Sequence, residues 1–292
     1  MVRRFDHLVL PVHDLDRARQ FYGRIGFTLT PLARHPFGTA NSLVQLQGNF
    51  LELLAVADPG VIPKPAPGKF SFGAFNETFL RKREGFSMLV LASQDAAADA
   101  AVFKAQGLDT YDVFHFGRDA TLPDGSKARV DFSLAFVTEP SMPEAVFFAC
   151  QQHAPQYFWR PEYQRHANGA IRIAEVVMSA AEPERYEKFF SKLMGAPSSQ
   201  SAEGLSVADA GEKLAVLDHA ALAKRYPEIA RRGDGDTPRF EAYVIATSSL
   251  ASVRRLLTGA GVPYCDAGRS VIIPPAAAFD LAIEFTEQPA KV

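Results

Sequence analysis

The stretch FDHLVLPVHDLDRARQFYGRIGF, residues 5–27, sets the pattern from which the fold can be worked out. It begins with FDHLVLPV, a short run of β-forming residues, and Asp14 then has the side chain to cap the N-terminus of a helix. Apolar residues follow at helical spacing, namely Leu15, Ala18, Phe21, Tyr22 and Ile25. Gly26 stands where a helix commonly ends in the left-handed conformation that glycine favours. The stretch therefore predicts a strand followed by a helix that stops at Gly26.

The same strand–helix–glycine pattern occurs three more times along the chain. The further strand segments are FSMLVLAS (86–93), IAEVVMSA (173–180) and FEAYVIAT (240–247). Matching strand and stop positions are 19 residues apart for His7 and Gly26, 19 for Met88 and Gly107, 20 for Glu175 and Gly195, and 19 for Ala242 and Gly261. A pattern that recurs at nearly constant spacing is typical of a chain built from repeated supersecondary units.

Short β-like runs follow each glycine, so each unit reads βαβββ. In the first unit these runs are TLTPL, NSLVQLQ and NFLELLAV. We therefore predict an α+β fold of four βαβββ modules, at residues 1–58, 84–157, 168–220 and 237–292. The Pro/Gly-rich segment PGVIPKPAPGK (59–69) joins the first two modules. The aromatic stretch YFWRPEYQRHANGA (157–170) separates an N-terminal domain, 1–157, from a C-terminal domain, 168–292.

Composition limits the class of protein. A chain of 292 residues with 47% hydrophobic and 22% charged residues is typical of a globular protein, and it is longer than one hydrophobic core usually supports. The formal net charge is −2, and no run of five like charges occurs, so we expect neither nucleic-acid binding nor attraction to anionic membranes. We expect a small-molecule ligand as the partner, and a homodimer is possible.

The N-terminus and the cysteines bear on the compartment. Pro11 and His13 interrupt the first apolar stretch, which is too short for a signal peptide or a membrane span. Cys150 and Cys265 are far apart and form no CxxC motif, which argues against a disulfide framework or a structural zinc site. We therefore expect a cytoplasmic protein.

These modules resemble those of a known superfamily. The DHLVL strand, the DLDRARQFYGRIGF helix and the glutamate-containing NFLELLA strand are similar to the opening module of the vicinal oxygen chelate superfamily. That superfamily includes glyoxalase I, extradiol dioxygenases and bleomycin-resistance proteins. The resemblance implies that two modules pair into a half-open barrel and that side chains from the first and last strand of each module hold a divalent metal in the cleft. It does not identify the reaction, because one scaffold hosts isomerases, lyases, dioxygenases and metal-free binders.

The resemblance places His7 and Glu52 at metal-ligand positions, on the first and last strands of the first module. Imidazole and carboxylate together suit Fe, Zn, Mn or Ni, so the identity of the metal stays open. Glu52 lies in FLELLA between apolar neighbours, where an unpaired carboxylate is costly. The alternative is that His7 is a hydrogen-bonded core histidine and Glu52 a solvated residue.

The second module departs from this pattern. Met88 stands where His7 stands in the first module, and a thioether binds hard divalent metals poorly. The last strand of the module, AVFFACQQH, supplies Gln152 and His153 as substitutes. With His7 and Glu52, His153 would complete a set of two histidines and one carboxylate. Strand alternation places Gln152 and His153 on opposite faces unless the strand ends or bulges between them.

The third and fourth modules look degenerate. Glu175 and Glu284 occupy ligand positions, but Ala215 and Ala242 stand where the other two ligands would be. Two carboxylates are few for a second metal. Modules could pair one with two and three with four, or one with four and two with three. Sequential pairing is the simpler expectation, since consecutive elements are usually neighbours in space.

Other polar residues near the expected cleft are candidates for substrate contacts. His35 and Asn41 lie in RHPFGTAN (34–41), which is either a structural turn or a loop that orients a substrate, and Gln152 is a third candidate.

Two hypotheses for function follow. The first is a metal-dependent enzyme of isomerase, lyase or dioxygenase type, in which the metal chelates a small oxygen-bearing substrate and Glu52 acts as general base. The second is a metal-free protein that binds or sequesters an apolar small molecule among its 23 phenylalanines. A third strong ligand beside His7 and Glu52 would distinguish the first from the second.

Overall fold

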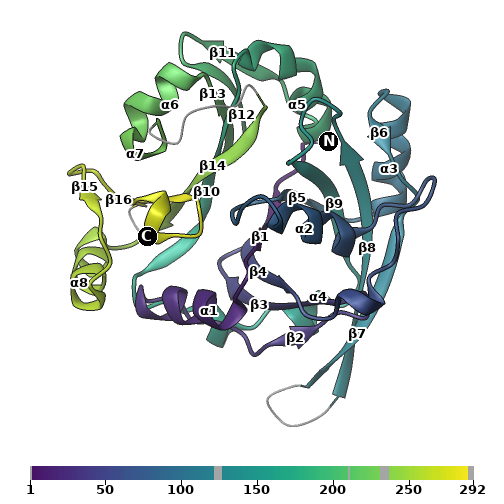
Figure 1. Ribbon diagram of the computed structural model, residues 1–292, viewed down its shortest axis with the longest axis horizontal. Helices are drawn as coiled ribbons and strands as arrows, with labels where there is room; N and C mark the ends of the chain where they lie inside the picture. The colour runs from purple at the N-terminus through teal and green to yellow at the C-terminus, as the bar shows by residue number, and fades with distance from the viewer. Residues whose placement is uncertain (1, 122–126, 210, 231–236, 289–292) are drawn as a thin grey trace.

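Two curled β-sheets with helices packed against them form the framework of the protein. The computed structural model describes residues 2–121, 127–209, 211–230 and 237–288. In Figure 1 the N-terminal half, coloured purple to teal, and the C-terminal half, coloured green to yellow, lie side by side, and each carries one sheet. This architecture confirms the predicted α+β fold, in which βαβββ modules pair into two half-open barrels.

The first sheet has the strand order β2-β3-β4-β1-β5-β9-β8-β6, with β7 paired to β8. Its strands are β1 (Phe5–Pro11), β2 (Ala33–Arg34), β3 (Thr39–Gln45), β4 (Phe50–Val56), β5 (Met88–Ser93), β6 (Asp109–Thr110), β7 (Phe114–Thr121), β8 (Lys127–Thr138) and β9 (Val146–Gln152). The helices of this half are α1 (Leu15–Arg24), η1 (Pro59–Val61), α2 (Phe72–Leu80), α3 (Ala96–Ala105), α4 (Pro155–Phe158) and η2 (Pro161–Gln164).

The second sheet has the strand order β11-β12-β13-β10-β14-β17-β16-β15. Its strands are β10 (Ala170–Ser179), β11 (Ser198–Ser201), β12 (Gly204–Asp209), β13 (Glu212–Leu217), β14 (Arg239–Thr247), β15 (Cys265–Asp266), β16 (Ser270–Ile273) and β17 (Ala282–Glu287). Its helices are η3 (Pro183–Tyr186), α5 (Glu187–Met194), α6 (His219–Arg225), α7 (Pro227–Ala230), α8 (Leu250–Ala260) and η4 (Pro275–Ala277).

The first strands of consecutive modules pair at the middle of each sheet. β1 runs antiparallel to β5 with Leu8 opposite Leu89, and each of them runs parallel to the last strand of its own module, β4 or β9. In the second sheet β10 and β14 pair in the same way, with Val176 opposite Tyr243. Module one therefore pairs with module two, and module three with module four, which decides the question that the sequence left open.

The helix signals in the sequence act as expected. Asp14 caps α1, because its carboxylate accepts a hydrogen bond of 2.9 Å from the backbone N–H of Arg17. The glycines that close the four modular helices all adopt positive φ, at 94° in Gly26, 75° in Gly107, 67° in Gly195 and 64° in Gly261. This backbone region is strained for other residues, so the repeated glycine has a physical reason at each position.

The two faces of each sheet enter different apolar clusters. One face of the first sheet, with Leu8, packs with the helices and with Tyr243 of the second sheet in one continuous core. The opposite face of the first sheet forms a separate cluster that includes Phe50 and Phe148. The second sheet has a smaller cluster of its own around Val177. The two halves thus share a core, while each keeps a separate concave face.

Polar contacts also join the halves. The Asn49 side chain makes two hydrogen bonds to the backbone of Ile173, at 2.9 and 3.1 Å. The carboxylate of Glu212 accepts a hydrogen bond of 2.7 Å from the backbone N–H of Phe5. Within the described residues, no helix is both long and apolar enough to cross a membrane.

The hydroxyl pair of Tyr22 and Tyr243 gives a test of the shared core. The two oxygens are 2.9 Å apart and both residues are fully buried. Tyr22→Phe leaves the Tyr243 hydroxyl without its partner, so we expect the free energy of unfolding to fall by about 1–2 kcal/mol. The double change to phenylalanine removes both polar groups and should cost less than the sum of the single changes. Urea denaturation of the three variants measures this, and strictly additive losses would contradict the coupling.

Candidate active site

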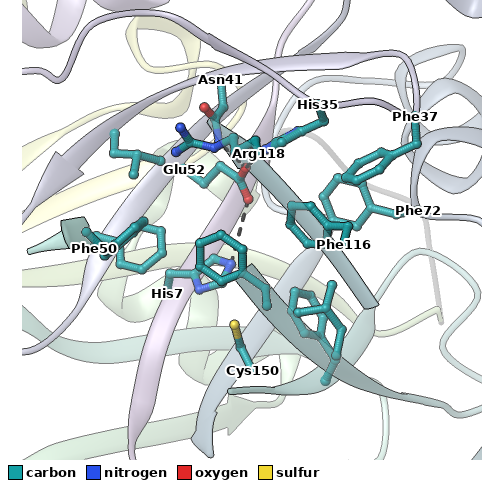
Figure 2. Close-up of a pocket in the computed structure, with 15 residues that line it drawn as sticks. His7, His35, Phe37, Asn41, Phe50, Glu52, Phe72, Phe116, Arg118 and Cys150 are labelled. Carbon is teal, nitrogen blue, oxygen red and sulfur yellow. Dashed lines mark hydrogen bonds and ion pairs between the residues drawn. The ribbon is translucent and has the colours of Figure 1, made fainter. Parts of the chain in front are cut away.

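The concave face of the first sheet encloses a pocket. It holds about 490 Å³ of empty space, part of it open to solvent. Seven phenylalanines line the pocket, and its charged, imidazole and amide groups belong to His7, His35, Asn41, Glu52 and Arg118. In Figure 2, Glu52, Arg118, Asn41 and His35 gather at one end, and His7 points toward Glu52 from the floor. The pocket therefore combines apolar walls with a compact polar group.

His7 and Glu52 face each other inside this pocket. β1 and β4 are neighbouring parallel strands in which Phe50 pairs with His7, so Glu52 lies one side-chain step further along the same face. The Nε2 atom of His7 is 3.7 Å from Oε2 of Glu52, and the two residues are only 5% and 6% exposed. The structure thus brings the two sequence candidates together.

Asp6 orients the imidazole of His7. Strand alternation places the side chains of neighbouring residues on opposite faces, so alternation alone did not predict this contact. Its Oδ2 lies 2.6 Å from Nδ1 of His7, and Gln152 donates a hydrogen bond of 2.9 Å to its Oδ1. The register of β1 against β5 shifts between Phe5 and His7, and this irregularity places Asp6 beside the histidine. With Nδ1–H donated to Asp6, Nε2 faces Glu52. Gln152, predicted to contact a substrate, instead holds Asp6 and does not line the pocket.

The second module supplies apolar residues at its two ligand positions. On β5, Met88 corresponds to His7, and it pairs with Val146 of β9. Glu52 is two residues beyond the partner of His7, and the same step beyond Val146 leads to Phe148. Met88 and Phe148 both belong to the apolar cluster on the concave face. The register therefore shows that the substitutes expected near residue 152 lie too far along β9.

His153 does not join His7 and Glu52, which corrects the expected set of three ligands. β9 ends at Gln152, and His153 is exposed beyond it, outside the pocket lining. Its Nε2 lies 2.6 Å from the Ser133 hydroxyl, which also contacts Nδ1 of His115 at 2.7 Å. The backbone N–H of His153 still donates a hydrogen bond of 2.9 Å to the carbonyl of Asp131 on β8, and the register before it has no bulge, so alternation continues to His153 and turns its side chain away from the pocket.

Asn41 and His35 instead complete the polar group around Glu52. The Asn41 amide donates a hydrogen bond of 2.6 Å to Oε1 of Glu52, and its nitrogen is 3.2 Å from Nε2 of His35. Nδ1 of His35 lies 2.8 Å from the Thr39 hydroxyl. The Oδ1 atom of Asn41 is buried and has no hydrogen-bond partner. This orphaned acceptor could receive a proton donor from a bound molecule.

Burial keeps His35 neutral at ordinary pH. Desolvation lowers the pKa of its imidazole to about 4, a neighbouring Glu52 opposes that change, and Arg118 adds to it. A neutral His35 can therefore accept a hydrogen bond or donate one without adding a second full charge to the pocket.

Arg118 is the charged member of the site that the sequence did not reveal. It lies on β7 and points into the pocket near Glu52 (Figure 2). Burial lowers the pKa of its guanidinium, while the negative charge of Glu52 opposes that change. β7 pairs with β8 in antiparallel orientation, and Phe114 and Phe116 alternate with other residues at its start. Since Arg118 is far from His7 and Glu52 in the sequence, only the folded sheet brings them together.

The residues present do not fit the metal chelate that the resemblance implied. His7 and Glu52 have ligand chemistry, but Met88 and Phe148 occupy the other two positions. In the described part of the chain, no group of three or more His, Cys, Asp or Glu residues is arranged to hold a metal ion. The groups of the chain that are available for chemistry in this pocket are therefore the side chains themselves, above all His7, Glu52 and Arg118.

The corresponding site of the C-terminal half contains an internal cation. Glu175 and Glu284 occupy its two remaining ligand positions, as the sequence predicted, and Arg225 of α6 lies between them. Arg225 donates hydrogen bonds of 2.8 and 3.0 Å to Glu175 and of 2.9 and 3.2 Å to Glu284. The Tyr226 hydroxyl adds one of 2.6 Å to Glu284. Arg225 and Lys213, whose Nζ atom is 3.2 Å from Oε1 of Glu175, thus balance the charges of the two carboxylates at these positions.

The lowered pKa of His35 predicts a pH dependence of stability. A histidine whose pKa falls on folding contributes stability above its unfolded pKa, and that contribution is lost as pH falls toward the folded value. Between about pH 7 and pH 5 the wild type should lose about 2 kcal/mol more of its unfolding free energy than His35→Gln does. Urea denaturation at the two pH values measures this. Equal losses in both proteins would show that His35 does not titrate as described.

The buried ion group of Arg225 predicts a second stability effect. Arg225→Met leaves Glu284 without a cation and Glu175 with Lys213 alone, so we expect the unfolding free energy to fall by about 2 kcal/mol. Adding Glu175→Gln should restore part of the loss. Lys224→Met is a matched control, because its ion pair with Glu203 is exposed. Thermal denaturation of the three variants and the wild type tests this, and equal effects at the two positions would contradict it.

Solved structures of similar shape come from several bacteria. A hypothetical protein from Staphylococcus aureus matches with a TM-score of 0.68 at 14% identity, covering 98% of this chain and 100% of that one. A mutant of 4-hydroxymandelate synthase from Streptomyces coelicolor matches at 0.58 and 10% identity, with 100% and 94% covered. A Mn(II)-bound glyoxalase from Novosphingobium aromaticivorans matches at 0.57 and 14% identity, with 100% and 84% covered. At such identities the likeness shows the fold alone.

Sequence comparison identifies the family. No curated protein matches the chain. A family model described as a glyoxalase-like domain matches residues 5–194, which is more than half of the chain and includes the whole pocket lining. The structural neighbours, a glyoxalase and a hydroxymandelate synthase, have the vicinal oxygen chelate fold. The chain therefore belongs to the family of glyoxalase-like domain proteins, and its fold is the vicinal oxygen chelate fold of these neighbours.

Proposed function

We propose that this protein is an enzyme that acts on a small oxygen-bearing substrate in the N-terminal pocket, by proton transfer of the isomerase or lyase type. The observation that carries the proposal is the pair formed by His7 and Glu52, whose Nε2 and Oε2 atoms are 3.7 Å apart inside an aromatic pocket. A base and an acid at this separation can act on neighbouring atoms of one small molecule.

Each group has a distinct role in this chemistry. Glu52 is the general base, and the Asn41 amide holds one of its oxygens while the other faces the pocket. His7 delivers or accepts a proton at Nε2, because Asp6 binds its Nδ1. Arg118 offers a positive charge to a substrate oxygen that becomes negative during the reaction.

A metal-dependent form of this activity was the expectation from the sequence, and one structural neighbour is a Mn(II)-bound glyoxalase. In the described part of the chain, His7 and Glu52 stand at the expected ligand positions, and His35 adds a second imidazole whose Nε2 atom is 3.9 Å from Oε1 of Glu52. Dioxygenase chemistry at Fe(II) ordinarily uses two histidines and a carboxylate. His7, His35 and Glu52 are residues of these types, but within the described residues they are not arranged to hold a metal ion. The closeness of His7 to Glu52 instead favours proton transfer between these two side chains.

A metal-free binding protein is the second candidate function. The seven phenylalanines of the pocket favour it, because burial of apolar surface alone can hold a ligand. The buried carboxylate and imidazoles argue for the enzyme instead. Burying charged and polar groups is costly, and a binder of apolar molecules gains little from them.

Proton exchange at carbon tests the enzymatic proposal. A panel of 2-oxo acids and aryl-substituted 2-hydroxy acids is incubated with the protein in D₂O. NMR follows loss of the proton on the carbon next to the 2-oxo group, or of the proton on the hydroxyl-bearing carbon of a 2-hydroxy acid. We expect exchange with at least one compound, and we expect Glu52→Gln and His7→Asn each to slow it by about 100-fold or more. Glu182→Gln and His219→Asn, both at exposed positions, are matched controls that should keep the full rate.

Metal content is measured on the same samples by elemental analysis before and after a chelator. The proposal expects exchange to survive removal of metal. Exchange that disappears with the metal, and metal that is lost in both Glu52→Gln and His7→Asn, would restore the metal-dependent hypothesis. Tight binding of aromatic compounds without exchange in any sample would favour the binding protein.

A further inference from the structure

A second cavity opens directly outside the pocket described above. It holds about 1580 Å³ of empty space, including open solvent, between β2, β3, β7, β8 and the segment 157–163. Leu43, Arg118 and Phe158 line both cavities, so these three residues form the boundary between them. A molecule longer than the inner pocket would extend across this boundary into the outer cavity.

Three arginines line the outer cavity without partners of their own. Arg34, Arg118 and Arg160 come from β2, β7 and the segment after α4. Within the part of the chain that the structure describes, none of their guanidinium groups forms an ion pair or a hydrogen bond. The Nη2 atom of Arg160 is buried and lacks any acceptor. Because a buried donor normally has a partner, this atom indicates that an acceptor is supplied from outside the chain.

Acidic groups of the outer cavity do not neutralise these arginines. Asp119 and Glu162 also line it, but both are exposed, and neither forms an ion pair with the three arginines. The boundary residue Arg118 is partly withdrawn from water and lies close enough to Glu52 for their charges to interact. The charges of Arg34 and Arg160 are therefore not offset by an ion pair within the described residues.

The walls of the outer cavity also carry exposed apolar groups. Leu32 is 44% exposed and Tyr157 is 41% exposed, which is unusual for large apolar side chains in this protein. Both line the cavity together with Tyr163. Apolar surface beside unpaired guanidinium groups suits a ligand that has both an anionic group and a carbon framework.

We propose that the outer cavity is an anion subsite, and that the natural ligand carries a carboxylate or phosphoryl group bound by Arg34, Arg118 and Arg160. The planar guanidinium donates paired hydrogen bonds to either group. The ligand then reaches past Leu43 and Phe158, so that its oxygen-bearing end lies beside His7 and Glu52. This inference names the substrate class of the proposed enzyme and rests on that proposal only for the reaction, not for binding.

Binding of three small probes tests the subsite. Isothermal titration calorimetry compares phenylacetate and phenyl phosphate with phenylacetamide, which has nearly the shape of phenylacetate but no charge. We expect at least one anion to bind about tenfold or more tightly than the amide, with affinity that falls as salt is added. Tighter binding of phenylacetate identifies a carboxylate site, and tighter binding of phenyl phosphate identifies a phosphoryl site.

Arginine variants locate the binding. Arg160→Gln and Arg34→Gln should each weaken the anion by about tenfold and leave the amide unchanged. Arg165→Gln is the matched control, because Arg165 lies in the same connecting segment but lines neither cavity. Arg34 and Arg165 are exposed, so these two changes should not disturb folding, and thermal denaturation confirms that. Equal affinity of the amide and both anions, or equal losses in Arg165→Gln and Arg160→Gln, would overturn the proposal.

The two proposals fail in different ways. Anion binding that depends on Arg34 and Arg160 without any proton exchange would sink the enzymatic function and leave the subsite intact. Exchange of uncharged carbonyl compounds that is insensitive to Arg34→Gln and Arg160→Gln would keep the enzyme and remove the subsite.

Discussion

The antiparallel pairing of β1 with β5 is the constraint on which the rest of the structure depends. It joins the first strands of two modules with Leu8 opposite Leu89, and the parallel strands β4 and β9 then flank them. Because side chains alternate along a strand, this register sends one set into the shared core and the other into the concave pocket. A slip of one residue would bury His7 and Glu52 in the helical core, where their charges would have no partners.

The same register explains why the two halves of the protein differ in chemistry. In the N-terminal half the concave face keeps His7 and Glu52 and replaces the other two ligand positions with Met88 and Phe148. In the C-terminal half two carboxylates remain, and Arg225 and Lys213 balance their charges from within the chain. One half therefore has a pocket with buried polar groups, and the other has a network of ion pairs in the corresponding place, at a cavity that is open to solvent.

The charged and polar groups of the N-terminal pocket stabilise one another. Glu52 would be costly to bury alone, but Asn41 donates to it, and His7 and Arg118 lie near it. Asp6 binds Nδ1 of His7, the ring nitrogen that does not face Glu52. Arg34, Arg118 and Arg160 line the outer cavity, between solvent and the inner pocket. Under the proposal, a negatively charged ligand meets these arginines before it reaches His7 and Glu52.

The sequence by itself determined the modular fold, because strand and helix periods and glycine stops are local signals. The pair of His7 and Glu52 followed from the resemblance of the first module to those of a known superfamily. Tertiary structure decided what surrounds that pair. Asp6 joined the site through a register shift, Arg118 arrived from a distant strand, and His153 stayed outside. These outcomes depend on which residues of different strands lie opposite one another. That register follows from the packing of the whole sheet and cannot be read from any one segment.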